Sequence, residues 1–173
     1  VFGPPEVEEM RMRALLDFVR GGKGIVGIHS ASVWDKEPAN PADGDFRQLI
    51  GGRFGDHPWE SEPASIRIED PSHPLNAAWG SKAALPLPFR DELFQFAPPY
   101  SRKKVRVLFS LDLSETADKG QRPDKDYPLA WVQSFGKGRS FYTALGHNKN
   151  AFCNAMFLRL LQDGVQFALG DLP

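Results

Sequence analysis

The 173-residue sequence has one cysteine, no excess of charge of either sign and no long hydrophobic run, and each of these absences excludes a class of protein. Because Cys153 has no second cysteine to pair with, an internal disulfide is excluded, which fits a reducing compartment. The 21 basic and 22 acidic side chains nearly cancel, so no overall field attracts nucleic acid or an anionic membrane surface. Apolar runs such as 24–28 are far shorter than the roughly 20 residues that span a bilayer. We therefore expect neither nucleic-acid nor membrane partners.

The length and the N-terminal sequence fit a single domain in the cytoplasm. A chain of this size with 41% hydrophobic residues can bury about two-thirds of its unfolded surface around one core. The first residues contain neither the basic segment nor the apolar segment of a secretory signal. A cytoplasmic location is therefore favoured, and bacterial export stays open in case an N-terminal segment precedes this sequence.

The order of the first predicted elements indicates an α/β fold. Apolar residues at positions 12, 15, 16 and 19 follow helical spacing after Pro4-Pro5, and residues 24–28 form a short apolar run typical of a strand covered on both faces. The small polar turn His29-Ser30-Ala31-Ser32 follows directly. This order is typical of a mostly parallel sheet with helices on both faces.

The rest of the chain predicts further strands, helices and loops. Residues 34–45 are rich in Pro, Asp and Asn and predict a loop that leads into a short helix near 46–50. Two apolar segments flank Gly136-Lys137-Gly138 and predict a β-hairpin of residues 129–135 and 139–145. Other strands are expected at 66–68, 89–96 and 105–111, a surface loop at 113–127 and a C-terminal helix at 157–168.

Three of the four histidines lie at or near predicted strand ends, where open α/β sheets bind their ligands. His29 follows the first strand, His57 lies in polar loop sequence, and His147 follows the hairpin. The acidic pair Asp91-Glu92 lies in an otherwise apolar segment. Imidazole nitrogens and a carboxylate oxygen are the donors that zinc prefers, with one position left open for water. Without a metal, the same groups could act as a general acid and base.

Simpler structural roles compete with these assignments. His29 could hydrogen-bond to the backbone at a tight turn. His57 and His73 each precede a proline, where side chains often satisfy local carbonyls. Asp91 or Glu92 could form an ordinary ion pair with the adjacent arginine. If all of these roles are structural, the histidines lie apart in space with local partners, and they form no catalytic site.

Two tryptophans in polar sequence are candidates for binding a sugar. Trp34 and Trp59 could each stack on a sugar ring, although aromatic residues are more often part of the core. The other two tryptophans lie in sequence that favours core packing.

Several enzyme classes lack their motifs in this sequence. Cys153 lies near the start of the last predicted helix rather than on a strand-to-helix turn, which argues against a cysteine amidotransferase. Ser30 lacks the two glycines of a Gly-x-Ser-x-Gly elbow, which disfavours a serine hydrolase. No Gly-x-Gly-x-x-Gly follows a strand, so no nucleotide cofactor is expected.

Six segments, taken in order, resemble the motifs of the trehalose-utilisation (ThuA-like) family. Their number and order make the resemblance more specific than any single motif, and together they extend over nearly the whole chain. The segments are residues 24–31, 49–54, 57–59, 69–74, 91–92 and 142–147.

The resemblance implies a fold related to class I glutamine amidotransferases, a flavodoxin-like sheet in which His29 stands where those enzymes have their cysteine. It also implies a single domain over residues 1–173 that lacks the strand-helix-strand segment with which family members usually begin. A missing strand would leave a sheet edge uncovered, so a homo-oligomer is one expectation. The acidic motif commonly continues with Trp and Tyr, where this chain has Leu93 and Phe94, and specificity inferred from relatives is weakened accordingly.

The residues and the resemblance together lead to one functional hypothesis and one alternative. The hypothesis is a sugar-processing enzyme, a hydrolase or isomerase acting on a trehalose-like or oxidised disaccharide, with a divalent metal, in the first place zinc, as its cofactor. The alternative is a non-catalytic carbohydrate-binding or accessory module. The predicted catalytic residues are His29, Asp91, Glu92 and His147, the metal ligands His29, His57, Glu92 and His147, and the substrate-binding residues Ser30, Trp34, Arg53, Asp56 and Trp59.

Overall fold

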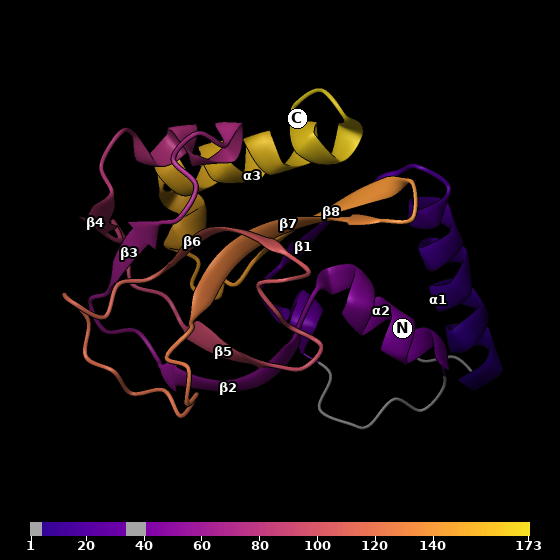
Figure 1. Cartoon of the computed structure of the whole chain (residues 1–173), viewed down its shortest axis with the longest axis horizontal. Coiled ribbons are helices and arrows are strands. Elements are labelled where there is room, and N and C mark those ends of the chain that lie inside the picture. The colour runs from indigo at the N-terminus through magenta and orange to yellow at the C-terminus, as the bar shows by residue number, and fades with distance from the viewer. Residues whose placement is uncertain (1–4, 34–40) are drawn as a thin grey trace.

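In the computed structural model, which describes residues 5–33 and 41–173, a six-stranded sheet carries helices on both faces (Figure 1). Helix α3 lies on one face, and α1 and α2 lie toward the other. The helices are α1 (Pro5–Arg20), α2 (Pro41–Ile50) and α3 (Ala155–Leu169), with 3-10 turns η1 (His29–Ser32), η2 (Pro74–Trp79) and η3 (Ala151–Cys153). The strands are β1 (Gly24–Ile28), β2 (Arg53–Trp59), β3 (Ser65–Ile68), β4 (Ala84–Pro86), β5 (Leu93–Ala97), β6 (Arg106–Leu111), β7 (Pro128–Phe135) and β8 (Gly138–Thr143).

The main sheet has the strand order β1-β8-β7-β6-β3-β4, and within the described residues only β1 and β8 pair in parallel. All other neighbours in this sheet are antiparallel. The mixed α/β class is confirmed, but the expectation of a mostly parallel, flavodoxin-like sheet is wrong for this part of the chain. Parallel neighbours require a long crossover, whereas a tight turn is enough for the β7–β8 hairpin.

Strands β2 and β5 form a separate antiparallel ribbon. Phe96 of β5 joins the ribbon to the main sheet, because its ring contacts Trp131 of β7 and Tyr142 of β8 at centroid distances of 4.8 and 5.7 Å. Strand β2 contains His57, for which the sequence predicted a loop. Its pairing with β5 is interrupted by two register shifts, and this irregularity explains why residues 53–59 lack the alternation typical of a strand.

The other predicted elements are present, with some different bounds. The first strand begins and ends as expected, and α1, the hairpin and α3 are confirmed. Helix α2 begins at Pro41, inside the predicted loop, and β5 begins at Leu93 rather than at residue 89. Trp34 lies outside the described residues. No helix in the described ranges has the length and hydropathy that crossing a membrane requires.

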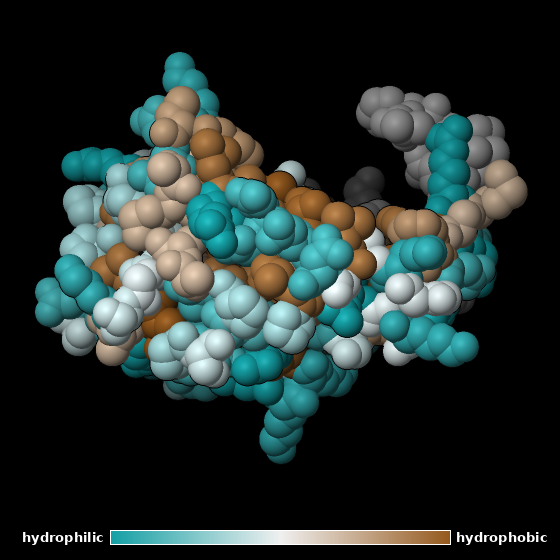
Figure 2. Space-filling view, turned by 90° about the horizontal axis from the view of Figure 1, so that it is seen from above, coloured by the Kyte–Doolittle hydropathy of each residue, from teal (hydrophilic) through white to brown (hydrophobic). Residues whose placement is uncertain are grey.

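Helix α3 packs closely on β8 because Gly164 has no side chain. A Cβ atom at this position would lie 2.3 Å from the Phe141 ring, which is fully buried. Other apolar side chains of α3 stay exposed. Figure 2, which views the molecule from this side, shows hydrophobic patches between hydrophilic ones. The exposed apolar residues on α3 are Leu158, Val165 and Leu169.

Replacing Gly164 with alanine is therefore expected to destabilise the fold by about 1–3 kcal/mol, the usual cost of overpacking a core. Gly44 of α2 is a matched control, because a Cβ atom there meets nothing within 4 Å. At that position alanine should stabilise the protein by about 0.4–1 kcal/mol, since it reduces the freedom of the unfolded chain. Urea unfolding of both variants measures the difference, and equal effects would contradict this account of the helix contact.

His73, the histidine outside the candidate site, has a structural role. Its side chain is 4% exposed and caps η2, where its Nδ1 atom accepts a hydrogen bond from the Leu75 N–H at 3.3 Å. Burial lowers the pKa of His73, the nearby Arg106 lowers it further, and Asp70 only partly opposes this shift. The capping nitrogen must stay unprotonated, so the neutral imidazole is the native form.

Stability is therefore expected to fall as the pH is lowered below about 6.5, the ordinary histidine value. In that range the unfolded chain binds a proton at His73 that the folded chain does not, so acid favours unfolding. Each pKa unit of difference contributes about 1.4 kcal/mol. Thermal melting at pH 7 and pH 5 should show a smaller drop for His73→Asn, which can still cap the turn. If the melting temperature falls equally in His73→Asn and in the wild type, other titratable groups cause the loss of stability.

Candidate functional site

A cavity of about 770 Å³ opens at the carboxyl ends of the parallel strands β1 and β8. This size is typical of small-molecule sites. The ribbon of β2 and β5 forms one wall, and η1 and the residues after β8 form the others. The lining residues are Ile28, His29, Ser30, Val33, Phe54, His57, Glu92, Phe94, Gly146, His147 and Phe152.

His29 is held in one orientation directly after β1. Its backbone has a φ of 43°, in the left-handed region that non-glycine residues seldom adopt. The Nδ1–H donates to the Ala144 carbonyl at 2.7 Å, and this bond leaves Nε2 as the free, unprotonated nitrogen of the neutral ring. The ring also packs on Phe94, with centroids 4.2 Å apart. The side chain is thus fixed with a lone pair facing the cavity.

Two hydroxyl groups brace the backbone of His29 from the core. Tyr142 donates its hydroxyl proton to the His29 carbonyl at 2.7 Å, and Ser32 Oγ lies 2.8 Å from the same hydroxyl. Burial raises the pKa of Tyr142, so the phenol stays a donor at any physiological pH. Neither Tyr142 nor Ser32 was among the predicted site residues. The available signals were that Tyr142 begins the motif-like segment 142–147 and that Ser32 ends the polar turn after the first strand.

Three ligand atoms converge beside His29. Its Nε2 lies 3.1 Å from Glu92 Oε2 and 3.1 Å from His147 Nδ1, and the latter two atoms are 3.4 Å apart. Zinc bonds of about 2.0–2.1 Å at tetrahedral angles place ligand atoms about 3.3 Å from one another. In the described part of the chain, these are the residues whose donor atoms are grouped closely enough for a metal ion.

His57 approaches the same carboxylate from the ribbon. Its Nδ1 atom is 3.5 Å from Glu92 Oε1 and is buried with no hydrogen-bond partner among the described residues. It is not part of the group formed by His29, Glu92 and His147. The four residues that the sequence selected as metal ligands are therefore brought to one cavity, with three in a triangle and His57 on the far oxygen of Glu92.

Asp91 and Glu92 point to different partners although they are adjacent. Asp91 is 1% exposed, and its two oxygens accept the backbone N–H groups of Gly146 at 2.5 Å and Asn148 at 2.7 Å. These residues lie on either side of His147. Asp91 thus fixes the segment that presents His147, while Glu92 faces the cavity.

The predicted substrate-binding residues are only partly at the cavity. Ser30 lines it and is exposed. Arg53 and Asp56 are neighbours of Phe54 and His57 on β2 but do not line it. Trp59 is 1% exposed, its Nε1 donates to the Ala117 carbonyl, and its ring packs on Tyr127, so a sugar-stacking role is wrong for this residue. The aromatic side chains that do line the cavity are Phe54, Phe94 and Phe152.

The acceptor atoms of the triangle need a proton or a metal ion between them. In the tautomer fixed by Ala144, the His29 Nε2 lone pair faces a carboxylate oxygen 3.1 Å away. Two acceptors at this distance repel unless a proton or a metal ion lies between them. The arrangement can therefore bind a divalent ion, or it can hold and transfer a proton.

Comparison with known proteins identifies relatives of the whole described fold. The family model for trehalose utilisation, ThuA, matches residues 4–168. A ThuA-like protein from Bacteroides uniformis superposes with a TM-score of 0.71 at 25% identity, over 91% of this chain and 62% of that one. A ThuA-like protein from Parabacteroides merdae gives 0.65 at 19% identity, over 99% and 68%.

A more distant structural likeness is to part of a large enzyme. The β-galactosidase of Bacillus circulans sp. alkalophilus gives a TM-score of 0.56 at 16% identity, and the match covers 92% of this chain but 20% of the enzyme. This likeness concerns the fold alone. The chain spans 62% of the length of the Bacteroides uniformis relative. No curated protein matches the chain.

Proposed function

Because the chain belongs to the trehalose-utilisation (ThuA) family, we propose that it is an enzyme of sugar metabolism, a hydrolase or isomerase acting on a trehalose-like or oxidised disaccharide. The observation that supports this proposal is the triangle of His29 Nε2, His147 Nδ1 and Glu92 Oε2, with sides of 3.1–3.4 Å, beside a cavity large enough for a small molecule. Family membership supports a sugar as the substrate. The triangle supports metal binding or proton transfer as the catalytic chemistry.

The donor set fits a divalent metal ion, zinc in the first place. Two neutral imidazole nitrogens and one carboxylate oxygen are the ligands of many catalytic zinc sites, which keep a fourth position for water or substrate. His29, Glu92 and His147 would hold the ion, which would act as a Lewis acid on a sugar oxygen. His57 then remains beside Glu92, where it can hydrogen-bond to the second carboxylate oxygen and orient it.

The side chains themselves can move a proton. His29 can accept one at Nε2 from a sugar hydroxyl, because its Nδ1–H remains bonded to the Ala144 carbonyl. The resulting imidazolium is stabilised by the Glu92 carboxylate at 3.1 Å. His147 is half exposed at the mouth and can exchange the proton with solvent. Asp91 acts as a positioning residue through the backbone on both sides of His147.

The walls of the cavity suit a saccharide. Phe54 and Phe152 offer apolar surface on which the C–H face of a pyranose can pack, and Ser30 offers a hydroxyl. Phe152 is 44% exposed, and its ring makes an edge contact with Phe157, at a centroid distance of 5.3 Å. Arg53 and Asp56 could contact only a sugar that extends beyond the cavity along β2.

Zinc titration by calorimetry, followed by metal analysis of the dialysed protein, tests the metal site. We expect one ion per chain in the wild type and none in His29→Ala or His147→Ala. His73→Asn is the matched control, because it removes a histidine that lies outside the cavity. Full zinc content in both site variants would rule out the metal. Activity toward trehalose and oxidised disaccharides, measured by sugar release or isomer formation, tests the reaction.

The exposure of Phe152 also favours a second function, a non-catalytic carbohydrate-binding or accessory module. In this case, saccharide affinity should fall by about tenfold in Phe152→Ala, the loss of one stacking contact, and survive in His147→Ala. Loss of binding in His147→Ala with binding intact in Phe152→Ala would exclude the module. Turnover of any disaccharide by the wild type would favour the enzyme.

The oligomeric state is also a proposal. Strand β1 is the edge of the sheet here, so a strand from a second copy could pair with it. Light scattering of the purified chain tests for a homo-oligomer.

A further inference from the structure

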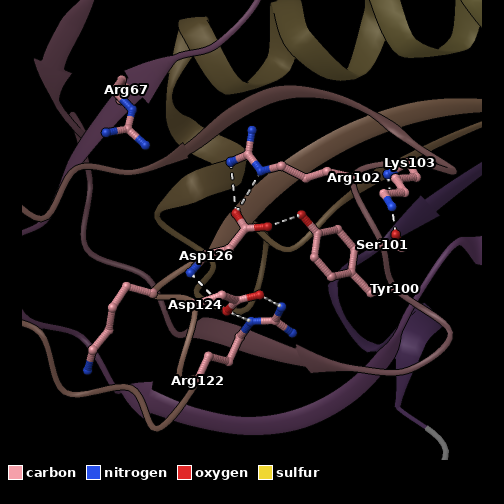
Figure 3. Close-up of a pocket in the computed structure, with 9 residues that line it drawn as sticks. Arg67, Tyr100, Ser101, Arg102, Lys103, Arg122, Asp124 and Asp126 are labelled. Carbon is pink, nitrogen blue, oxygen red and sulfur yellow. Dashed lines mark hydrogen bonds and ion pairs between the residues drawn. The ribbon is translucent and has the colours of Figure 1, made fainter.

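A second cavity, of about 550 Å³, lies away from the histidines. Its walls come from the connection after β5, from the loop that precedes β7 and from Arg67 of β3 (Figure 3). Glu92 precedes β5 and Tyr100 follows it, so the two cavities lie near opposite ends of this strand. They share no lining residue.

Cationic side chains outnumber carboxylates in this cavity. Two of the arginines are fixed by ion pairs: Arg102 binds Asp126 through two N–H groups at 2.8 and 2.9 Å, and Arg122 binds Asp124 at 2.6 and 2.9 Å. Figure 3 shows both pairs, with the Tyr100 hydroxyl on the second oxygen of Asp126. The lining cations are Arg67, Arg102, Lys103, Arg122 and Lys125, and the lining anions are Asp124 and Asp126.

One carboxylate oxygen, Glu69 Oε1, is shared by too many donors. Ser110 donates to it at 2.6 Å, while Arg67 and Arg102 approach it at 3.1–3.3 Å. Charge-assisted bonds of this type are usually about 2.7–2.9 Å, so the bonds from both arginines to Glu69 are long. Arg102 is also held by Asp126 at 2.8 and 2.9 Å, whereas Arg67 is only partly satisfied. Burial opposes ionisation of Glu69, but the hydrogen bonds from Ser110 and Arg102 outweigh it and its pKa is lowered, so this carboxylate stays charged.

Two side chains in this cavity therefore have N–H donors available to bind a ligand. Arg67 has a half-exposed side chain, and within the described part of the chain its one ion pair is with the shared Glu69 oxygen. Lys103 is exposed, and its Nζ has no hydrogen-bond or ion-pair partner among residues 5–33 and 41–173. In Figure 3 the guanidinium groups of Arg67 and Arg102 lie on the same side of the cavity.

We propose that this cavity binds a phosphate-type anion, with Arg67 and Arg102 as its donors and with Lys103, on the other side of Arg102, as a donor to the rest of a larger phosphorylated ligand. Guanidinium groups present forked N–H donors that match the oxygens of a tetrahedral oxyanion. The cavity is larger than a free ion needs, so the phosphate group of a phosphorylated metabolite fits the same donors. This site does not depend on the reaction proposed for the histidine cavity.

Calorimetry with inorganic phosphate, glucose 6-phosphate and glucose tests the proposal. We expect both phosphates to bind and glucose not to bind. Both affinities should fall at least tenfold in Arg67→Ala, and the affinity for glucose 6-phosphate should also fall in Lys103→Ala. These side chains are exposed, and their loss leaves the Arg102–Asp126 pair in place. Arg13→Ala is the control, because it removes one positive charge from an exposed i,i+4 pair on α1.

The outcomes separate the sources of the anion. Tighter binding of glucose 6-phosphate than of phosphate supports a phosphorylated metabolite, and equal binding supports recognition of the phosphate group alone. The absence of binding by both, or affinities unchanged in Arg67→Ala and Lys103→Ala, would overturn the proposal. Preference for an acidic peptide such as oligoglutamate over every phosphate would also overturn it. Unchanged zinc content in both variants shows that the histidine cavity is intact.

Discussion

Replacing Glu92 with glutamine is expected to reduce zinc affinity by more than the roughly 10–100-fold that loss of an outer-shell partner costs. Glu92 is the residue that all three histidines of the cavity approach, at 3.1, 3.4 and 3.5 Å. The amide is nearly isosteric but carries no charge, so it removes the electrostatic attraction and leaves the packing unchanged. Calorimetric zinc titration at constant pH measures the difference.

Glutamine at Glu115 provides the matched control for that experiment. Glu115 is exposed in the segment after β6, so its replacement changes the net charge equally without touching the cavity. We expect its zinc affinity to match the wild type. If Glu92→Gln and Glu115→Gln bind zinc equally well, the triangle is not the metal site.

Replacing Asp91 with asparagine is expected to lower both stability and zinc affinity. The carboxylate accepts the N–H groups of Gly146 and Asn148, whereas an amide has one oxygen and turns its NH2 group toward the other donor. A buried N–H left without an acceptor costs about 1–3 kcal/mol. Since these bonds flank His147, zinc affinity should also fall by about 10–100-fold, as for other outer-shell residues.

A stability control separates these two effects of Asp91. Gly164→Ala also destabilises the protein, but its contact is with Phe141, on the α3 face of the sheet. Zinc affinity measured well below the melting transition should be normal in Gly164→Ala and reduced in Asp91→Asn. A normal affinity in both would limit Asp91 to a role in stability.

Local patterns in the sequence predicted the elements whose neighbours in space are also neighbours in sequence. Residues 24–28 are apolar throughout because β1 lies between elements on both faces of the sheet, and the hairpin of β7 and β8 needs only its own turn. The strand order could not be predicted, because it depends on contacts between residues far apart in the chain. The mostly parallel sheet was inferred from the first helix and strand alone. Strand β1 does have a parallel neighbour, but β6 and β7 pair antiparallel with theirs.

The candidate site was predicted in its composition but not in its geometry. Histidines after two strand ends could be expected to meet, because β1 and β8 are parallel and end at the same edge. No pattern indicated that Asp91 would bind backbone while Glu92 faced the cavity, since both belong to the same short acidic motif. Trp59 was misassigned because its neighbours in sequence are polar. Its own ring is nevertheless buried, with contacts to Ala117 and Tyr127.

The bracing of His29 by Tyr142 and Ser32 divides the site into a fixed floor and a variable rim. The floor is tied to the core through Tyr142 and Ser32, which are buried, so a change there alters the fold as well as the chemistry. The rim consists of Ser30 and Phe152, which are exposed. Substitutions at the rim can therefore change which ligand the cavity admits, while the residues of the floor keep their places.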